Sequence, residues 1–413
     1  YRLDRLSYVE NKNYKKQGSK YYYLAYKDDF TSPVLVQKNK YTDEYGDIVI
    51  DPRSFAKRKE QITISGYKVN KAESHIVFSL SHSGSDWREV RIRNLNKDRY
   101  LDDVIKWVKY SPIYWKNNGF FYWKWKKPEK GKELLEQATH QKLYYHKINT
   151  KQEEDKLIFD SGEAFSRSSY KVTSDERYLL IYTFDETEDG YKKVILFKDL
   201  NANNDFKELL SYENEEGDYS IIEHLNNRFF IYTNNESNNG RVFSINPTTK
   251  EITNIIPEYN YKLDQVDIVN NKIICLLYKK GKYTLLIHDL NGKLLSKLPF
   301  DPGHKVTLLK ADNNDKELIY TVNSFYFPSI VYTLDLQNNS VDYISKTTIA
   351  YDHEKFETKF IHYKSKDGTY IPAYLTYKKG TNLTSGNAPV FLHGYGGFGS
   401  SMLPHFDPGY ILF

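Results

Sequence analysis

Lys272-Ile273-Ile274-Cys275-Leu276-Leu277-Tyr278 is an aliphatic run of strand length whose pattern recurs along the chain and decides the fold. A polar turn follows it, and a second run from Tyr283 to His288 ends on His288-Asp289-Leu290. Two such runs around a short polar turn predict a β-hairpin.

Six further pairs of runs share this pattern, so the chain carries seven predicted hairpins. Their first strands are Tyr21–Tyr26, His75–Leu80, Phe120–Trp125, Tyr178–Phe184, Phe229–Thr233, Ile273–Tyr278 and Leu318–Val322. Their partners are Pro33–Gln37, Val90–Arg93, Lys142–Lys147, Lys193–Phe197, Arg241–Ile245, Tyr283–His288 and Ile330–Leu334.

The spacing of these hairpins identifies the architecture. The first strands, centred near residues 22, 77, 121, 180, 230, 274 and 319, are 44 to 59 residues apart. Four short antiparallel strands need about that length, so the repetition predicts a mainly β fold, a seven-bladed β-propeller over residues 16–350. A helical solenoid is excluded because the 3.6-residue period is missing. Two stacked β-sandwiches are the alternative.

The pattern changes after Tyr351. Lys359–Lys364 alternates in polarity, Asp367-Gly368 supplies a tight turn, and Tyr370–Tyr377 returns, which predicts one more hairpin. A polar loop then leads to an apolar run at 389–393, predicted as a strand that would be buried in a complete sheet. In the chain as given we expect this strand to lack neighbours, which would expose Val390, Phe391 and Leu392. We therefore place a domain boundary near 350, with residues 351–413 as the start of an α/β-hydrolase domain.

The apolar run opens into the glycine-dense stretch His393-Gly394-Tyr395-Gly396-Gly397-Phe398-Gly399. A buried strand that opens into an HG-x-GG turn is how α/β-hydrolases place oxyanion donors beside a nucleophile. The nucleophile itself should follow in a G-x-S-x-G turn. Gly399-Ser400-Ser401 does not supply it, because the closing glycine, the preceding strand and the following helix are missing.

Composition narrows the function classes. The 413 residues are 39% hydrophobic and 16% aromatic, which favours half-buried aromatic strands. The 59 basic and 54 acidic residues leave a charge of +5, too weak and too dispersed for a nucleic-acid-binding protein. Alternation in Trp123-Lys124-Trp125-Lys126 predicts a strand with one packed face rather than a nucleic-acid platform. The histidines lack metal-ligand spacing, so neither a metal nor another cofactor is expected.

The single cysteine, Cys275, and the hydropathy profile bear on the cellular compartment of the protein. A single cysteine excludes an internal disulfide and favours a reducing compartment, and its apolar neighbours predict a buried, unreactive thiol. No apolar stretch approaches the roughly 20 residues that span a bilayer. We expect a soluble, cytoplasmic monomer without membrane or nucleic-acid partners, although the chain opens at Tyr1 rather than at a methionine.

Several separated motifs resemble the prolyl oligopeptidase family of serine peptidases. They are Ser83-Gly84-Ser85-Asp86-Trp87, His140-Gln141-Lys142-Leu143-Tyr144-Tyr145-His146, Ser365-Lys366-Asp367-Gly368-Thr369 with Ile371-Pro372, and Gly394-Tyr395-Gly396-Gly397-Phe398. The resemblance covers nearly the whole chain and implies a seven-bladed propeller that caps an α/β-hydrolase domain, with residues 1–15 as the end of an N-terminal segment on the hydrolase side. Related oligopeptidase B enzymes, which cut after basic residues, tend to carry Gly-Ser-Tyr where this chain has Gly396-Gly397-Phe398.

The resemblance also implies site residues. Tyr395 matches a tyrosine whose hydroxyl stabilises the tetrahedral oxyanion, and Phe398 matches a wall of the pocket for the substrate proline. His393 departs from the usual tyrosine, and because the family's catalytic base comes from further downstream, we expect a structural role for His393. Short proline-containing peptides are the implied substrates, with the propeller restricting their access.

Three functions remain open at this stage. The first is a fragment of a serine endopeptidase that cleaves after proline. The second is an oligopeptidase B-like peptidase. The third is a propeller that acts as a binding module, or a pseudoenzyme, without catalysis. Because the 413 residues carry no Ser-Asp-His triad in the family's order, the chain alone is expected to be inactive.

Overall fold

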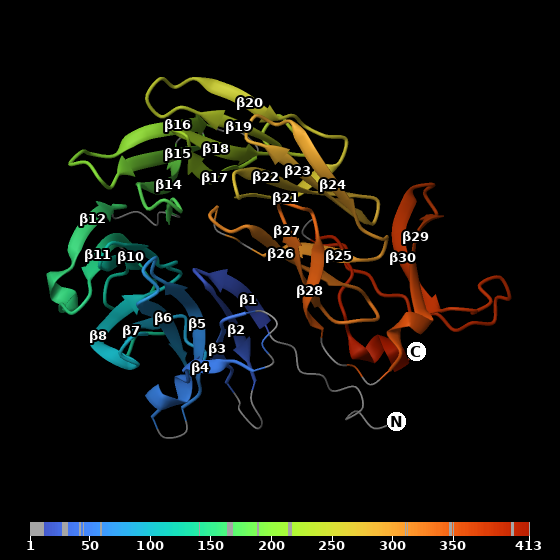
Figure 1. Cartoon of the computed structure of the whole chain (residues 1–413), viewed down its shortest axis with the longest axis horizontal. Coiled ribbons are helices and arrows are strands. Elements are labelled where there is room, and N and C mark those ends of the chain that lie inside the picture. The colour runs from blue at the N-terminus through green and yellow to red at the C-terminus, as the bar shows by residue number, and fades with distance from the viewer. Residues whose placement is uncertain are drawn as a thin grey trace. The chain divides into compact units, whose positions relative to one another are not determined.

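The computed structural model describes residues 12–26, 32–40, 43, 45–57, 60–139, 141–162, 168–187, 190–213, 217–309, 311, 313–346, 349, 351–397 and 400–412. In these residues the chain is almost entirely antiparallel β-sheet (Figure 1). The helices described are short 3₁₀ turns: η2 (Pro52–Phe55), η3 (Gln152–Glu154), η4 (His353–Lys355) and η5 (Pro408–Leu412). None of them is long and apolar enough to cross a membrane.

The chain divides into two compact units, residues 12–216 and a second that contains residues 217–413. In the first unit, one sheet has the order β1 (Lys12–Gln17), β2 (Lys20–Ala25), β3 (Val34–Lys38) and β4 (Asp47–Ile50). Another has the order β13 (Ser169–Val172), β14 (Tyr178–Thr187), β15 (Gly190–Asp199) and β16 (Lys207–Glu213).

An eight-stranded sheet of the first unit consists of two four-stranded groups. The first group is β5 (Ile62–Val69), β6 (His75–His82), β7 (Arg88–Asn94) and β8 (Arg99–Val108). The second is β9 (Tyr114–Lys116), β10 (Gly119–Lys124), β11 (Lys142–Lys147) and β12 (Lys156–Asp160). The groups meet where Lys124 of β10 pairs with Val108 of β8, a single step of the ladder.

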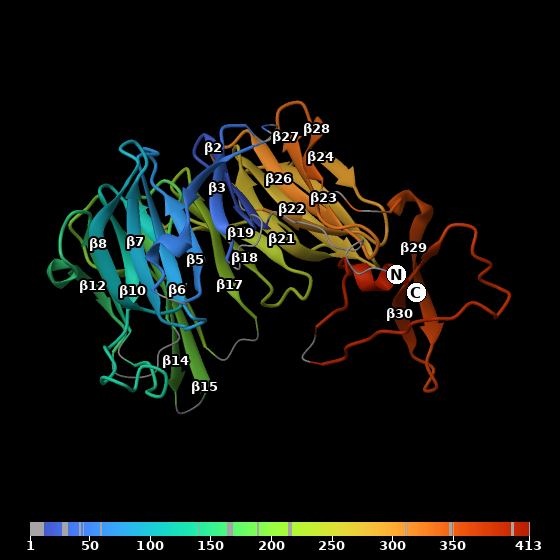
Figure 2. The ribbon, with the colours of Figure 1, turned by 90° about the horizontal axis from the view of Figure 1, so that it is seen from below.

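The second unit holds three four-stranded sheets and one hairpin. The sheets are β17 (Tyr219–Leu225), β18 (Arg228–Thr233), β19 (Arg241–Ile245) and β20 (Ile252–Ile256); β21 (Lys262–Val269), β22 (Lys272–Lys279), β23 (Lys282–Asp289) and β24 (Leu294–Pro299); and β25 (Lys305–Leu308), β26 (Glu317–Asn323), β27 (Ile330–Asp335) and β28 (Val341–Lys346). The hairpin is β29 (Phe356–Lys364) with β30 (Tyr370–Lys378) (Figure 2).

The predicted hairpins are confirmed. All seven occur as antiparallel pairs: β2–β3, β6–β7, β10–β11, β14–β15, β18–β19, β22–β23 and β26–β27. The Asp367-Gly368 turn joins β29 to β30 as expected, with Gly368 at φ +89°.

The central strands are apolar throughout because both of their faces are buried. In β22, Ile273 and Cys275 pack toward β17–β20, whereas Ile274 and Leu276 pack toward β25–β27. Successive side chains point to opposite faces of a sheet, so each face meets a different neighbouring sheet. A single two-sheet sandwich would leave one face of each sheet in solvent, whereas β22 is covered on both faces. Seven blades in one ring remain the prediction of the sequence.

The same arrangement explains the tryptophan-rich strand β10. Phe120 and Tyr122 pack toward β6–β8, while Phe121 and Trp123 pack toward β13 and β14. The strand is therefore packed on both faces and not, as predicted, on one; the expected alternation appears only beyond its end, where Trp125 is buried and Lys126 is exposed. Cys275 is fully buried as predicted, and burial raises the pKa of its thiol to about 12.

The prediction of a buried strand at 389–393 is wrong. The structure gives this run no strand, and Val390, Phe391 and Leu392 are exposed. An apolar sequence becomes a strand only where another strand satisfies its backbone groups, and none pairs with it in the described part of the chain. The exposure itself agrees with the expectation that this run has no neighbours.

Candidate functional site

Tyr395 lies in an irregular segment after the hairpin β29–β30. The residue is 53% exposed. A Cβ added at Gly394 or Gly396 would meet no atom within 4 Å. At Gly397, by contrast, a Cβ would lie 3.1 Å from the Tyr395 hydroxyl oxygen, so the phenol folds back over a position that glycine keeps open. Phe398 lies outside the described residues.

His393 contacts the C-terminal segment rather than Tyr395. Its Nδ1 lies 3.1 Å from the hydroxyl oxygen of Tyr410, which in turn lies 3.3 Å from Nε2 of His405. The His405 ring packs edge-on against Phe325, with ring centroids 6.1 Å apart. These contacts fit the expected structural role of His393.

The hairpin that precedes the glycine loop is held against the sheets of the second unit. The hydroxyls of Tyr278 on β22 and Tyr374 on β30 are 2.9 Å apart, and Phe325 packs on Tyr374. At Gly281, which has a φ of +76°, an added Cβ would lie closer than 3.0 Å to the ring of Phe360 on β29. The turn between β22 and β23 therefore approaches the hairpin as closely as only glycine allows, and this contact holds β29 of the hairpin that precedes the segment carrying Tyr395.

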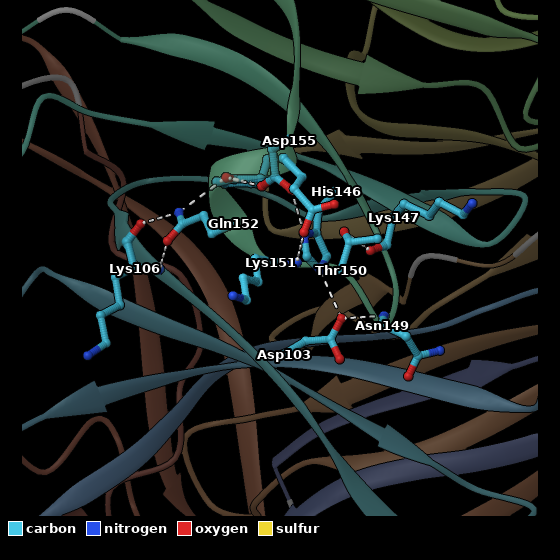
Figure 3. A network of polar contacts seen from close by, with 11 residues as sticks. Asp103, Lys106, His146, Lys147, Asn149, Thr150, Lys151, Gln152 and Asp155 are labelled. Carbon is cyan, nitrogen blue, oxygen red and sulfur yellow. Dashed lines mark hydrogen bonds and ion pairs between the residues drawn. The ribbon is translucent and has the colours of Figure 1, made fainter.

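A second polar cluster lies inside the eight-stranded sheet (Figure 3). Its centre is His146 on β11, whose side chain is fully buried. The imidazole Nε2 is 2.9 Å from Asp103 Oδ1 on β8, and Nδ1 is 2.6 Å from Asp155 Oδ1, just before β12. The Tyr122 hydroxyl donates to Asp155 Oδ2 at 2.6 Å, and the backbone N–H of Asn149 donates to Asp103 Oδ1 at 2.6 Å.

This environment keeps His146 protonated. Burial opposes its charge, but the hydrogen bonds and the attraction of Asp103 and Asp155 outweigh burial and raise the pKa of His146 to about 9. Burial also opposes the charge of Asp103, yet the bonds from His146 and Asn149 hold its pKa below the ordinary value. The three side chains thus form a buried cation between two carboxylates.

The cluster resembles part of a catalytic triad in composition only. Its histidine and carboxylates are closed off from solvent, and both ring nitrogens are occupied by carboxylates, so no nitrogen is left to accept a nucleophile's proton. Sequence reasoning placed His146 in a motif but missed its partners. Asp103 is 43 positions away, and no spacing rule joins a residue of β8 to one of β11.

Comparisons with known proteins identify the fold. The family model described as prolyl oligopeptidase, N-terminal beta-propeller domain, matches residues 3–347. The prolyl endopeptidase of Elizabethkingia meningoseptica is 25% identical over 407 residues, which cover 96% of this chain and 56% of that protein. The prolyl endopeptidase of Dictyostelium discoideum is 28% identical over 408 residues, covering 85% of this chain and 53% of that protein.

Solved structures agree on the fold. The apo form of prolyl oligopeptidase B from Galerina marginata superposes with a TM-score of 0.83 at 23% identity, over 97% of this chain and 60% of that one. The chain thus spans little more than half the length of the curated relatives named above. Because the family model matches most of its residues, the chain belongs to the prolyl oligopeptidase family and contains the family's N-terminal β-propeller domain.

Proposed function

We propose that this chain supplies the propeller and the first part of the hydrolase domain of a serine-type endopeptidase, which cleaves short peptides on the carboxyl side of proline. The observation that carries the proposal is the Gly394–Phe398 sequence motif with the exposed residue Tyr395, in a chain that belongs to this family. The curated relatives named prolyl endopeptidase support the same substrate class.

In the proposed reaction, Tyr395 stabilises the oxyanion. A nucleophile attacks the carbonyl carbon of the proline residue, and negative charge develops on the carbonyl oxygen. A phenol can donate a strong hydrogen bond to that oxygen without bringing a competing charge. The nucleophile, base and acid belong, in this proposal, to the remainder of a hydrolase domain, because Gly399-Ser400-Ser401 is not a nucleophile elbow.

The propeller is proposed to select substrates by size. In the second unit, the inner strands of its sheets are packed on both faces, which gives those sheets a close-packed interior. Short peptides would reach the site whereas folded proteins would be excluded. We place the end of the propeller near residue 350, which is supported by the end of the family match at residue 347. A cytoplasmic monomer remains part of the proposal.

Phe398 is proposed to form one wall of the proline pocket, where an apolar ring complements the pyrrolidine. In an enzyme with the hydrolase half present, Phe398→Ala should lower kcat/KM for a proline reporter by about 1–3 kcal/mol, roughly 10- to 200-fold, with a smaller effect on a matched alanine reporter. Steady-state kinetics on Gly-Pro and Gly-Ala reporter peptides measure both values. An unchanged proline-to-alanine ratio would remove Phe398 from the pocket.

A further inference from the structure

The two strand groups of the eight-stranded sheet share very little backbone pairing. Lys124 pairs with Val108, and the Trp125 amide donates to the Trp107 carbonyl at 2.9 Å. Elsewhere in the described first unit, neighbouring sheets pack face to face without a shared ladder. The junction between β5–β8 and β9–β12 therefore depends on side chains.

The buried cluster of His146 spans this junction away from the single ladder step. Asp103 comes from β8 in the first group, whereas His146 and Asp155 come from β11 and the segment before β12 in the second. Gln152 of η3 adds a neutral link, because its side chain exchanges two hydrogen bonds with the backbone of Lys106 on β8, at 3.1 and 3.0 Å. The charged link is thus centred on one imidazole (Figure 3).

We infer that Asp103, His146 and Asp155 form a proton-dependent latch, which holds β5–β8 and β9–β12 together and weakens when His146 loses its proton. A neutral imidazole carries one N–H, so it can donate to only one of the two carboxylates. The other carboxylate would then face a nitrogen lone pair inside the protein. A buried charge that loses its partner is costly, so the junction should loosen.

Among the titratable groups that face His146, only the imidazole itself changes charge between neutral and mildly alkaline pH. Asp103 is held ionised by a lowered pKa, and burial raises the pKa of Tyr122 well above this window. His75 on β6 lies within the field of Asp103, but burial lowers its pKa, so it is already neutral at pH 7. Asp155 accepts from both His146 and Tyr122.

The sign of the pH effect follows from the raised pKa. The folded state binds the His146 proton more tightly than the unfolded state, whose histidine has a pKa near 6.5. The stabilisation is therefore fully present below about pH 6.5 and is lost as the pH rises through 9. The pKa of His146 is about 9 in the folded state and near 6.5 in the unfolded state. When the pH rises across this range, the unfolding equilibrium constant should therefore rise roughly 100-fold.

The tryptophans make this latch directly observable. All five, Trp87, Trp107, Trp115, Trp123 and Trp125, lie between residues 87 and 125, in or beside the two strand groups. Urea unfolding of the 413-residue chain, followed by tryptophan fluorescence between pH 6.5 and 10, should show the roughly 100-fold change in the unfolding constant. His146→Gln should be less stable at pH 6.5 and should lack most of the wild-type dependence on pH, keeping only the smaller loss of stability above about pH 9 that the raised pKa of the buried Cys275 thiol produces.

Two further variants keep the test decisive if His146→Gln does not fold. Asp103→Asn removes one carboxylate and should move the loss of stability to lower pH. Tyr122→Phe removes a hydrogen bond to Asp155 but keeps the ion pairs, so it should lower stability while leaving the pH-dependent step in place. A wild-type chain whose unfolding constant does not change over this window would refute the latch. So would an Asp103→Asn variant with an unshifted pH profile.

Discussion

Replacing Tyr395 with phenylalanine, in an enzyme with the hydrolase half present, should lower kcat/KM by roughly 10²–10³-fold, about 3–4 kcal/mol. Tyr395 is an exposed residue of the glycine loop, and its hydroxyl is proposed to act on charge that exists only in the transition state. Ground-state binding should therefore change little, and kcat should fall in parallel with kcat/KM.

The measurement is steady-state hydrolysis of a Gly-Pro reporter, with Tyr363→Phe as the matched control. Tyr363 on β29 is also an exposed tyrosine, and losing its hydroxyl should leave the kinetics unchanged. If Tyr395→Phe were silent, or raised KM without lowering kcat, the oxyanion assignment would fall, and the glycine loop would be only a marker of the fold.

Gly292→Ala should destabilise the second unit by about 3–4 kcal/mol, because it combines backbone strain with overpacking. Gly292 lies in the turn between β23 and β24 at φ +88°, and its amide donates to the Asp289 carbonyl at 3.1 Å. A Cβ there would lie closer than 3.0 Å to the backbone oxygen of Ile255 on β20. A backbone atom cannot swing aside as a flexible side chain can, so the two sheets would have to separate.

Gly84→Ala is the matched control for this substitution. Gly84 has a φ of +75° in the turn between β6 and β7, and an added Cβ would meet no atom within 4 Å. Gly84→Ala should therefore lower the free energy of unfolding only through backbone strain, by about 1–2 kcal/mol. Chemical unfolding followed by circular dichroism gives both free energies. Equal losses would show that the close approach at Gly292 contributes nothing.

The inner strands of each sheet could be predicted because burial on both faces leaves a continuous apolar run. In β22 five consecutive residues, Ile273 to Leu277, are buried. The outer strands could not be predicted in this way. Leu294 and Leu295 on β24 are about half exposed, as is Ile252 on β20. Such strands form because an adjacent inner strand pairs with their backbone N–H and C=O groups, so their own sequence does not reveal them.

The same reasoning explains the error at 389–393. Val390-Phe391-Leu392 has the composition of a buried strand, but composition does not supply the neighbouring strand that would bury it. For the site, a local motif was enough to single out Tyr395 and Phe398. The Asp103–His146–Asp155 cluster has no local signature, because it exists only once β8 lies against β11.

The proposed specificity is tested most directly by hydrolysis of three matched reporter peptides that differ only in the residue before the cleaved bond: proline, alanine or arginine. With the hydrolase half present, the proline reporter should have the highest kcat/KM, about 10- to 200-fold above alanine, and a serine-directed inhibitor should abolish its turnover. The 413-residue chain alone should turn over none of them. Preference for arginine would instead assign the chain to an oligopeptidase B-like peptidase, and no hydrolysis of any reporter by the completed enzyme would contradict the proposed peptidase function.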